Sequence, residues 1–246
     1  MDHGKTKIVA VIAEKRIDST IKKGYLTANS GLADIIQFNI DALESEQVNE
    51  FSVRLAKMGV INKPVILSIR NMESVHPDLR EHHGYRNGGH DLNRIGLLRK
   101  GAEVNVEYIE MEHNFRRNIF FDPQITKLII RYSDFEKTPG YDELRKVCDN
   151  IITRGADIIN LETQIRENGD KDVLYKLMAE YGSIKPMVAV GLGDIGKDTW
   201  FEGYNHGACF AYGHTNSPWQ VMKRGAPVPG MPHLNDLREK LGNAKS

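Results

Sequence analysis

Residues 155–163 read GADIINLET, and this stretch decides how the rest of the chain is interpreted. A Gly-Ala-Asp turn leads into an apolar run that is typical of a buried strand, but Asn160 and Glu162 interrupt the run. Successive side chains of a strand point to opposite faces, so an amide and a carboxylate two residues apart share one face. The stretch therefore predicts a strand with one apolar face and one polar face.

Similar apolar runs, rich in Ile and Val, recur along the whole chain. The candidate strands are 7–13, 35–40, 64–69, 106–112, 127–133, 157–162, 186–192 and 208–213. Helix-like segments between them include 45–58, 89–100, 141–154 and 170–181. The segment 141–154 has clear boundaries, because Pro139 and Gly140 precede it, acids occupy its first turn and Gly155 follows it.

The number and order of these segments predict the fold class. Eight strands alternating with helices over 246 residues are typical of an α/β protein with a (β/α)8 TIM barrel. The alternative is an open doubly wound sheet, which usually carries a Gly-rich phosphate turn after its first strand. No G-x-G-x-x-G follows residues 7–13, and no linker or low-complexity tract divides the chain. We therefore predict a single barrel domain over residues 1–246.

Composition limits the partners and the compartment. Lys+Arg and Asp+Glu both number 33, and this zero net charge argues against a nucleic-acid partner. The two cysteines, Cys148 and Cys209, lie far apart and form no metal motif, which fits a reducing compartment. The apolar run at 7–13 is too short for a signal peptide or a membrane span. We expect a cytoplasmic protein with no membrane partner.

Two segments are longer than the regular spacing allows, namely 71–90 and 213–233. In a barrel both would be loops at the carboxyl ends of strands, where this fold places its active site. The first contains four histidines, which are His76, His82, His83 and His90. No helical His-x-x-x-His spacing or clustered carboxylate accompanies them, so we predict no metal there.

Polar residues gather near the predicted carboxyl ends of the strands. They are Gln37, Asn39, Ser68, Arg70, Glu110, Glu112, Ser133, Asp134, Asn160, Glu162 and His214, with Cys209 and Ala211 beside them. The pairs 37/39, 110/112 and 160/162 each share a face. An outward orientation would place them against helices, but apolar neighbours such as Phe38, Ile109 and Leu161 already suit that interface. We therefore predict a polar barrel interior, whose buried groups a polar ligand would satisfy.

Several longer stretches resemble one known family. They are ADIIQFNIDAL (33–43), PVILSIRNMES (64–74), LIIRYSDFEKTPGYDEL (128–144), RGADIINLET (154–163), PMVAVGLGDIGKDTWFEG (186–203) and PVPGMPHLNDLREKL (227–241). In this order they are similar to type I 3-dehydroquinate dehydratase, over nearly the whole chain. The resemblance implies a (β/α)8 barrel, usually a homodimer, that dehydrates 3-dehydroquinate through a lysine Schiff base with a histidine as general acid and base.

The resemblance also implies that the two central catalytic groups are missing. The family's Schiff-base lysine falls at Asn160, and its catalytic histidine falls at Ser133. An amide nitrogen is no useful nucleophile, so Asn160 cannot form an iminium. A serine hydroxyl does not titrate near neutrality and cannot replace imidazole as the proton carrier. We therefore predict a divergent homologue without 3-dehydroquinate dehydratase activity.

Other family positions carry polar or aromatic replacements. The acid and arginine of the second strand fall at Gln37 and Asn39, a loop glutamate falls at Asn87, the arginine that binds the substrate carboxylate falls at Trp200, and the last-loop glutamine falls at Met231. Arg70, Glu110, Glu112 and Asp134 keep the family residue, whereas Glu162 adds a carboxylate. Polar replacements of similar size indicate a site changed for another ligand, one that is larger or less anionic.

Three functions remain open on the sequence. The first is a repurposed lyase- or isomerase-like enzyme of secondary metabolism that performs non-covalent acid–base chemistry without a cofactor. Its candidate catalytic residues are Glu162, Glu112, Arg70 and Asp134. Its candidate ligand-binding residues are Gln37, Asn39, Asn87, Ser133, Asn160, Trp200, His214 and Met231. The second is a pseudoenzyme that binds a small molecule, and the third is an enzyme with a metal on Glu110, Glu112 and Glu162.

Overall fold

Eight parallel strands form the centre of the protein in a computed structural model, which describes residues 6–43, 50–51, 54, 61–70, 91–103, 105–114, 125–217 and 228–243. The strands are β1 (Lys7–Ile12), β2 (Ile35–Asn39), β3 (Val65–Ser68), β4 (Tyr108–Glu112), β5 (Lys127–Asp134), β6 (Ile158–Gln164), β7 (Met187–Leu192) and β8 (Phe210–His214). Each of the eight strands overlaps one of the strands predicted from the apolar runs. The α/β barrel class is therefore confirmed.

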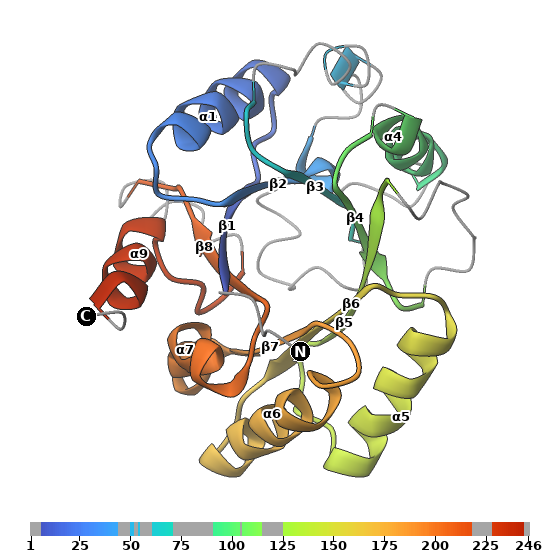
Figure 1. The fold of residues 1–246 in the computed structure, drawn as a ribbon, viewed down its shortest axis with the longest axis vertical. Helices are drawn as coiled ribbons and strands as arrows, with labels where there is room; N and C mark the ends of the chain where they lie inside the picture. The colour runs from blue at the N-terminus through green and yellow to red at the C-terminus, as the bar shows by residue number, and fades with distance from the viewer. Residues whose placement is uncertain are drawn as a thin grey trace.

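Helices surround the strands (Figure 1). They are α1 (Ile17–Asn29), α4 (Asp91–Glu103), α5 (Tyr141–Thr153), α6 (Asn168–Tyr181), α7 (Gly193–Glu202) and α9 (Leu234–Asn243), with the short 3-10 turns η1 (Ile40–Ala42) and η4 (Gly203–His206). α6 begins two residues earlier than predicted, because Glu167 and Asp170 form a capping box. The predicted helix 45–58 lies mostly outside the described residues.

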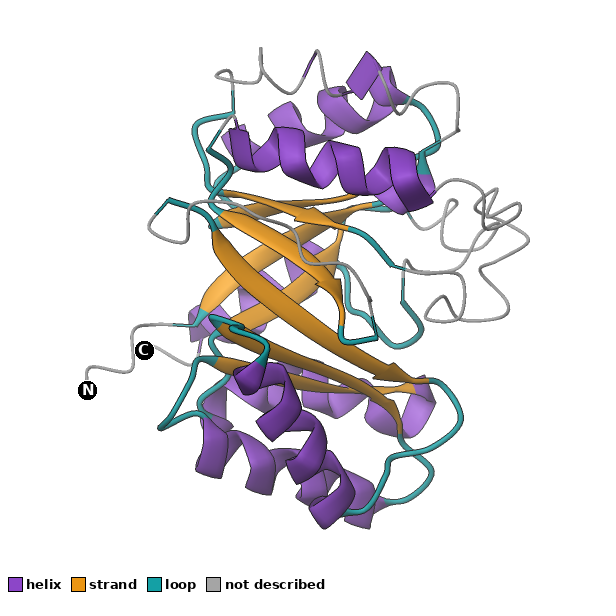
Figure 2. Cartoon of the chain, turned by 90° about the vertical axis from the view of Figure 1, so that its right-hand side faces the viewer, coloured by secondary structure: helices purple, strands orange, loops and turns teal. Residues whose placement is uncertain are grey.

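The strand order shows how the sheet curves into a barrel. Neighbouring strands pair in the order β7-β6-β5-β4-β3-β2-β1-β8, and all of these pairs are parallel. The two ends of this sheet meet where the Cys209 backbone N–H donates to the Met187 carbonyl at 2.9 Å. Figure 2 shows the strands crossing the middle of the molecule between layers of helices. The carboxyl ends of all eight strands therefore lie at one end of the barrel.

Residues that face outward from the strands form the main apolar core. Ile36, Phe38, Ile109, Ile159 and Leu161 are fully buried, as predicted for the interface between sheet and helices. One close approach explains a helical glycine. A Cβ on Gly24 in α1 would lie 2.6 Å from the Phe38 ring, so only glycine lets this helix reach β2 so closely.

Two strands begin later than the sequence predicts. β4 begins at Tyr108 rather than 106, and β8 begins at Phe210 rather than 208. Ala208 instead closes the turn after η4, because its backbone N–H donates to the Gly203 carbonyl at 3.0 Å and Gly207 has a positive φ of 86°. Among the residues described, none of the helices combines the length and apolar character needed to cross a membrane.

Candidate functional site

A buried ion-pair network occupies the interior of the barrel, and Arg131 of β5 lies at its centre. The Arg131 side chain is only 2% exposed. Its Nη1 lies 3.0 Å from Glu110 Oε2, and its Nε donates to Glu112 Oε1 at 2.8 Å. Glu162 Oε1 lies 3.9 Å from Nη1. Three carboxylates from β4 and β6 therefore share one guanidinium, a group that presents its donors in a fixed fork.

The register of the strands creates this convergence. Glu112 of β4 pairs with Arg131, and Arg131 pairs with Asn160 of β6, so these side chains point to the same face of the sheet. On β7 the same face carries Val188 and Val190, next to Asn160 and Glu162. The interior is therefore polar on one side and apolar on another.

Glu110 connects side chains from β2, β3, β5 and β6 through its two carboxylate oxygens. Its Oε2 accepts hydrogen bonds from Ser68 at 2.5 Å and Gln37 at 3.4 Å, in addition to the contact with Arg131. Its Oε1 accepts a hydrogen bond from the Asn160 amide nitrogen at 2.8 Å. A carboxylate with this many partners on a fully buried side chain is a structural anchor, because each partner stabilises its charge.

Glu112 and Glu162, the other two acids of the network, both have raised pKa values. Burial raises the pKa of Glu112 to about 7, although Arg131 opposes this and the charges of Glu162 and Glu110 reinforce it. Burial also raises the pKa of Glu162, again against Arg131. Burial lowers the pKa of Arg131, but its three acidic neighbours outweigh this effect and hold that pKa well above its usual value. The network therefore contains a permanent cation and a carboxyl group that can exchange a proton near neutral pH.

The buried amides turn their oxygen atoms away from Glu110. A carboxylate can only accept hydrogen bonds, so the nitrogen atoms of Gln37 and Asn160 must face it. Their oxygens, Gln37 Oε1 and Asn160 Oδ1, have no hydrogen-bond partner among the described residues, and neither has Glu112 Oε2. Buried polar atoms of this kind normally have partners, so a ligand is a natural candidate to supply them.

A second ion pair lies beside this network on β3. Arg70 Nη2 lies 3.0 Å from Asp41 Oδ2, and Arg70 Nε donates to the same oxygen at 3.1 Å. Both side chains are buried. Arg70 also lies close enough to lower the pKa of Glu162. The predicted catalytic arginine therefore faces the same interior as Glu162 and is held by an aspartate in η1.

β8 contributes Tyr212 and His214 to the interior. Tyr212 pairs in register with Val9, and its buried hydroxyl has no hydrogen-bond partner among the described residues. Its pKa is raised well above the usual value by burial and by the charges of Glu110 and other groups. Burial lowers the pKa of His214 to about 4, with further lowering from the charges of His233 and Lys23.

Cys209 and Ala211, which the sequence placed at the mouth of the barrel, have the opposite orientation to Tyr212. The neighbouring Gly213 shows which way they point, since a Cβ there would meet Leu234 and Leu237 of α9. That part of the sequence prediction was wrong, because residues 209 and 211 share the outward face with 213.

Three predicted site residues lie apart from the network. Asp134 ends β5 on the outward face, and its Oδ1 accepts the backbone N–H groups of Glu136 at 2.9 Å and Lys137 at 3.0 Å. Trp200 is buried in α7, where its indole N–H donates to the Gly191 carbonyl at 2.8 Å. Met231 is buried next to Gly230. A Cβ added at Gly230 would lie 3.3 Å from the Trp200 indole nitrogen.

The remaining candidates have simpler outcomes. Asn39 is buried and accepts a hydrogen bond from the Gln37 amide at 2.9 Å. Ser133 is partly exposed and pairs in register with Glu162, and its hydroxyl has no partner among the described residues. Asn87 and the four histidines of segment 71–90 lie outside the described residues. The structure therefore gathers Gln37, Asn39, Ser133, Asn160 and the acids near Arg131.

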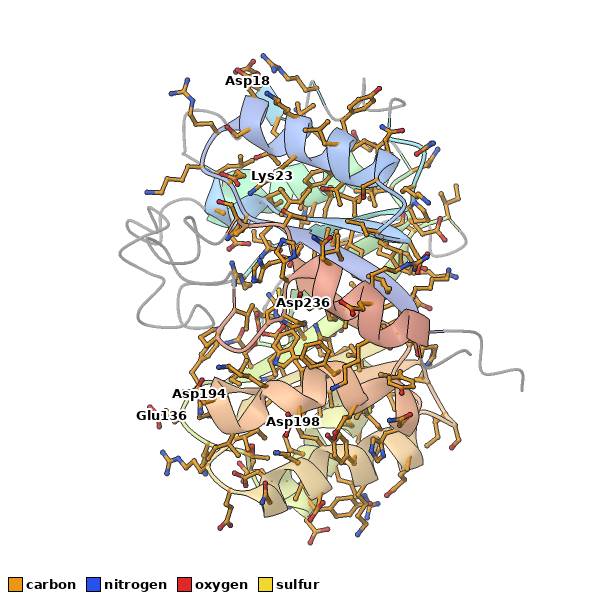
Figure 3. All side chains as sticks on the ribbon, turned by 90° about the vertical axis from the view of Figure 1, so that its left-hand side faces the viewer. Asp18, Lys23, Glu136, Asp194, Asp198 and Asp236 are labelled. Carbon is orange, nitrogen blue, oxygen red and sulfur yellow. The ribbon has the colours of Figure 1, made fainter. Side chains whose placement is uncertain are left out.

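Several acidic residues on the outer helices are exposed, unlike the buried carboxylates inside the barrel. Figure 3 labels Asp194, Asp198 and Asp236, which lie on the outer helices α7 and α9. Within the described ranges, no group of three His, Cys, Asp or Glu side chains is arranged to hold a metal ion. The carboxylates inside the barrel surround the Arg131 guanidinium.

The sequence analysis missed Arg131, Tyr212 and Asp41. A signal for Arg131 was present, because it lies two residues before Ser133 and must share the face predicted to point inward. Tyr212 stands in the same relation to His214. Asp41 lies beyond the end of β2, and only the tertiary structure brings it to Arg70.

The fold and this site define a (β/α)8 barrel with its polar groups at the carboxyl ends of the strands, as in barrel enzymes. Residues 9–245 match the family of type I 3-dehydroquinase. The chain therefore belongs to this family.

Relatives and solved structures agree with this assignment. The chain is 28% identical over 236 residues to the 3-dehydroquinate dehydratase of Methanococcus maripaludis strain C7, which covers 92% of this chain and 95% of that protein. It is 27% identical over 219 residues to the enzyme of the same name from Methanocaldococcus jannaschii, with 83% and 90% covered. The fold is similar to 3-dehydroquinate dehydratase from Geobacillus kaustophilus, with a TM-score of 0.80, 15% identity, and 98% and 92% of the chains covered.

Proposed function

We propose that this barrel is a repurposed member of its family. In this proposal it acts on a small polar metabolite, such as a cyclic or aromatic compound, by non-covalent acid–base and electrostatic catalysis. The reaction would be a dehydration, an isomerisation or a cyclisation, without Schiff-base dehydration of 3-dehydroquinate. The observation that carries the proposal is the buried network of Glu110, Glu112, Glu162 and Arg131 around Asn160, the residue at which the sequence resemblance places the family's lysine.

The surroundings of Asn160 support the absence of covalent catalysis. Its amide nitrogen donates to Glu110 at 2.8 Å, so this group is fixed as a hydrogen-bond donor. An amide nitrogen has no basic lone pair with which to attack a carbonyl. Among the described residues, the buried polar side chains include no lysine that could take over the nucleophile's role. Ser133 offers a hydroxyl at the position where the sequence resemblance places the family's imidazole.

Glu112 has the properties of a general base in this site. A pKa of about 7 leaves a large fraction ionised at neutral pH, while keeping the conjugate acid available to return the proton. Its Oε2 is free within the described structure. Glu162 lies on the partly exposed side next to Ser133, and Arg131 and Arg70 are positioned to stabilise negative charge that develops on a substrate.

The first test is turnover of 3-dehydroquinate. The purified protein is incubated with this compound while the conjugated product is followed by ultraviolet absorbance. A parallel sample is treated with borohydride and examined by mass spectrometry for an adduct. We expect neither turnover nor adduct. Turnover at rates usual for enzymes, or a trapped lysine, would show that the old chemistry persists and would refute the proposal.

The alternative is a non-catalytic protein that binds a small molecule. The many hydrogen bonds to Glu110 favour it, since side chains held in fixed positions are as well suited to recognition as to reaction. The result that would identify a binding protein is saturable ligand binding without turnover. In that case Glu112→Gln would change the affinity for the ligand and nothing else. A homodimer, which the family resemblance implies, also remains a proposal, and light scattering after size-exclusion chromatography tests it.

A further inference from the structure

Three buried hydrogen-bond acceptors inside the barrel lack a partner among the described residues, whereas Arg131 Nη2, which also has no hydrogen bond there, lies 2.8 Å from Glu112 Oε1. Gln37 Oε1, Asn160 Oδ1 and Glu112 Oε2 have no partner in the described part of the chain. The orientation of both amides follows from Glu110, which accepts the hydrogen bonds that their nitrogen atoms donate. These three residues are between 0% and 3% exposed. Because unpaired buried acceptors are costly, the missing partner should be rich in N–H or O–H donors.

The charges of the interior also favour a ligand that donates hydrogen bonds. Three carboxylates, those of Glu110, Glu112 and Glu162, contact the single guanidinium of Arg131. The neighbouring Arg70 pairs with its own aspartate, Asp41, at 3.0 Å. Counted over the described side chains of this cluster, three carboxyl groups face one guanidinium, and burial disfavours their ionised forms until a proton or a cation compensates the charge.

An independent feature lies across the barrel on β8. The Tyr212 hydroxyl is buried and has no partner in the described structure, and it lies close enough to Glu110 and Glu162 for their charges to act on it. The unpaired atoms therefore belong to β2, β4, β6 and β8 rather than to one acidic cluster. Glu162 and Ser133, which pair in register, lie towards the partly exposed end of this interior.

We propose that the ligand of this site carries a protonated amine or amidine and no carboxylate, and that its N–H groups bind to Glu112 and to the side-chain oxygens of Gln37 and Asn160. This inference rests on the proposed function and specifies its substrate class. It assigns a cationic molecule to a family whose named relatives act on 3-dehydroquinate, an anion. The Arg131 guanidinium already among the acids favours an organic cation with directional donors over a metal ion.

Three ring compounds of matched size test the proposal on the whole protein. They are trans-4-aminocyclohexanol, trans-4-hydroxycyclohexanecarboxylate and 1,4-cyclohexanediol, which are cationic, anionic and neutral at pH 7.5. Binding is measured by calorimetry and by the rise in melting temperature at millimolar concentrations. We expect the amine to bind at least about tenfold more tightly than the carboxylate, because a hydrogen bond to a charged group is gained in one case and repulsion in the other.

Variants locate the binding site. Glu112→Gln should weaken binding of the amine about tenfold or more, whereas Asp194→Asn, on the exposed surface of α7, should leave it unchanged. Tyr212→Phe removes only a hydroxyl and provides a second variant if Glu112→Gln fails to fold. The comparison of the three compounds on the unmodified protein requires no variant.

The outcomes separate this inference from the proposed function. Preference for the carboxylate, or no binding of any of the three compounds, overturns the inference. A rise in melting temperature with Mg²⁺ or Ca²⁺ that depends on Glu112, without binding of the amine, also overturns it in favour of a metal site. Turnover of 3-dehydroquinate would refute the proposed function instead. Binding of the amine supports the inference even if no reaction is ever found.

Discussion

Replacement of Arg131 by methionine removes the guanidinium that contacts Glu110, Glu112 and Glu162 while keeping a long apolar stem in its place. The guanidinium is 2% exposed, and its contacts with the first two carboxylates are 3.0 and 2.8 Å long. Removal of one partner of a buried ion pair costs about 3–5 kcal/mol, because the remaining charges stay buried without compensation. For a chain of this length, this loss corresponds to a decrease in melting temperature of about 10 °C.

The assay for Arg131→Met is unfolding in urea together with a thermal scan, at pH 8 and at pH 5. The loss should be smaller at pH 5, because Glu112 and Glu162, whose pKa values are raised, can then take up protons. Arg145→Met is the matched control, since Arg145 is about half exposed and lies 3.9 Å from Glu180. Its loss should stay below about 1 kcal/mol.

Two results would contradict this reasoning. One is a loss for Arg131→Met at pH 8 that is no larger than that of the Arg145 control. The other is a loss that does not change between pH 8 and pH 5. A further check is the double variant Arg131→Met/Glu112→Gln, which should recover part of the stability because one uncompensated charge is removed with its cation.

Three other predictions concern Glu112, Asp134 and His214. The pKa of Glu112 rises from 4.5 to about 7 on folding, so its contribution to stability is complete below pH 4.5 and is lost as the pH rises through 7. Between pH 5 and pH 8, the free energy of unfolding of Glu112→Gln should therefore rise by about 3 kcal/mol relative to that of the unmodified protein, as measured by chemical denaturation. A difference between the two proteins that stays constant with pH would contradict this prediction. Asp134→Ala should cost about 1 kcal/mol through the lost backbone hydrogen bonds and leave ligand binding intact, whereas a loss of binding at full stability would return Asp134 to the site. His214 should stay neutral down to about pH 4, so its imidazole NMR signals should not titrate between pH 5 and 8; a midpoint near 6.5 would show that it is not buried as described.

Much of the barrel could be predicted from local patterns. Short Ile- and Val-rich runs such as 7–13 and 186–192 are long enough for strands and too short for helices, and their regular alternation with amphipathic segments leaves few possible folds. The two-residue spacing of Glu110 with Glu112 and of Asn160 with Glu162 also predicted which side chains share the interior. Alternation along a strand is a covalent property, so it survives without any knowledge of the neighbours.

Orientation was harder to predict wherever a strand end or a loop was involved. Asp134 was expected at the mouth, but it lies one residue beyond Ser133 and so faces outward, where it caps the turn at Glu136. Trp200 was expected as a stacking surface for a ligand. In the structure its indole is buried and bonded to Gly191, because α7 packs closely on β7.

The sequence by itself determined the fold class and the shared interior face of Glu110 with Glu112 and of Asn160 with Glu162, because both depend on periodicity along the chain. Only the tertiary structure decided how these residues combine. Arg131, Glu112 and Asn160 become neighbours through the register between strands, which hydrogen bonds and packing set across many residues. The resulting charge balance depends on burial, and burial is a property of the closed barrel rather than of any single strand.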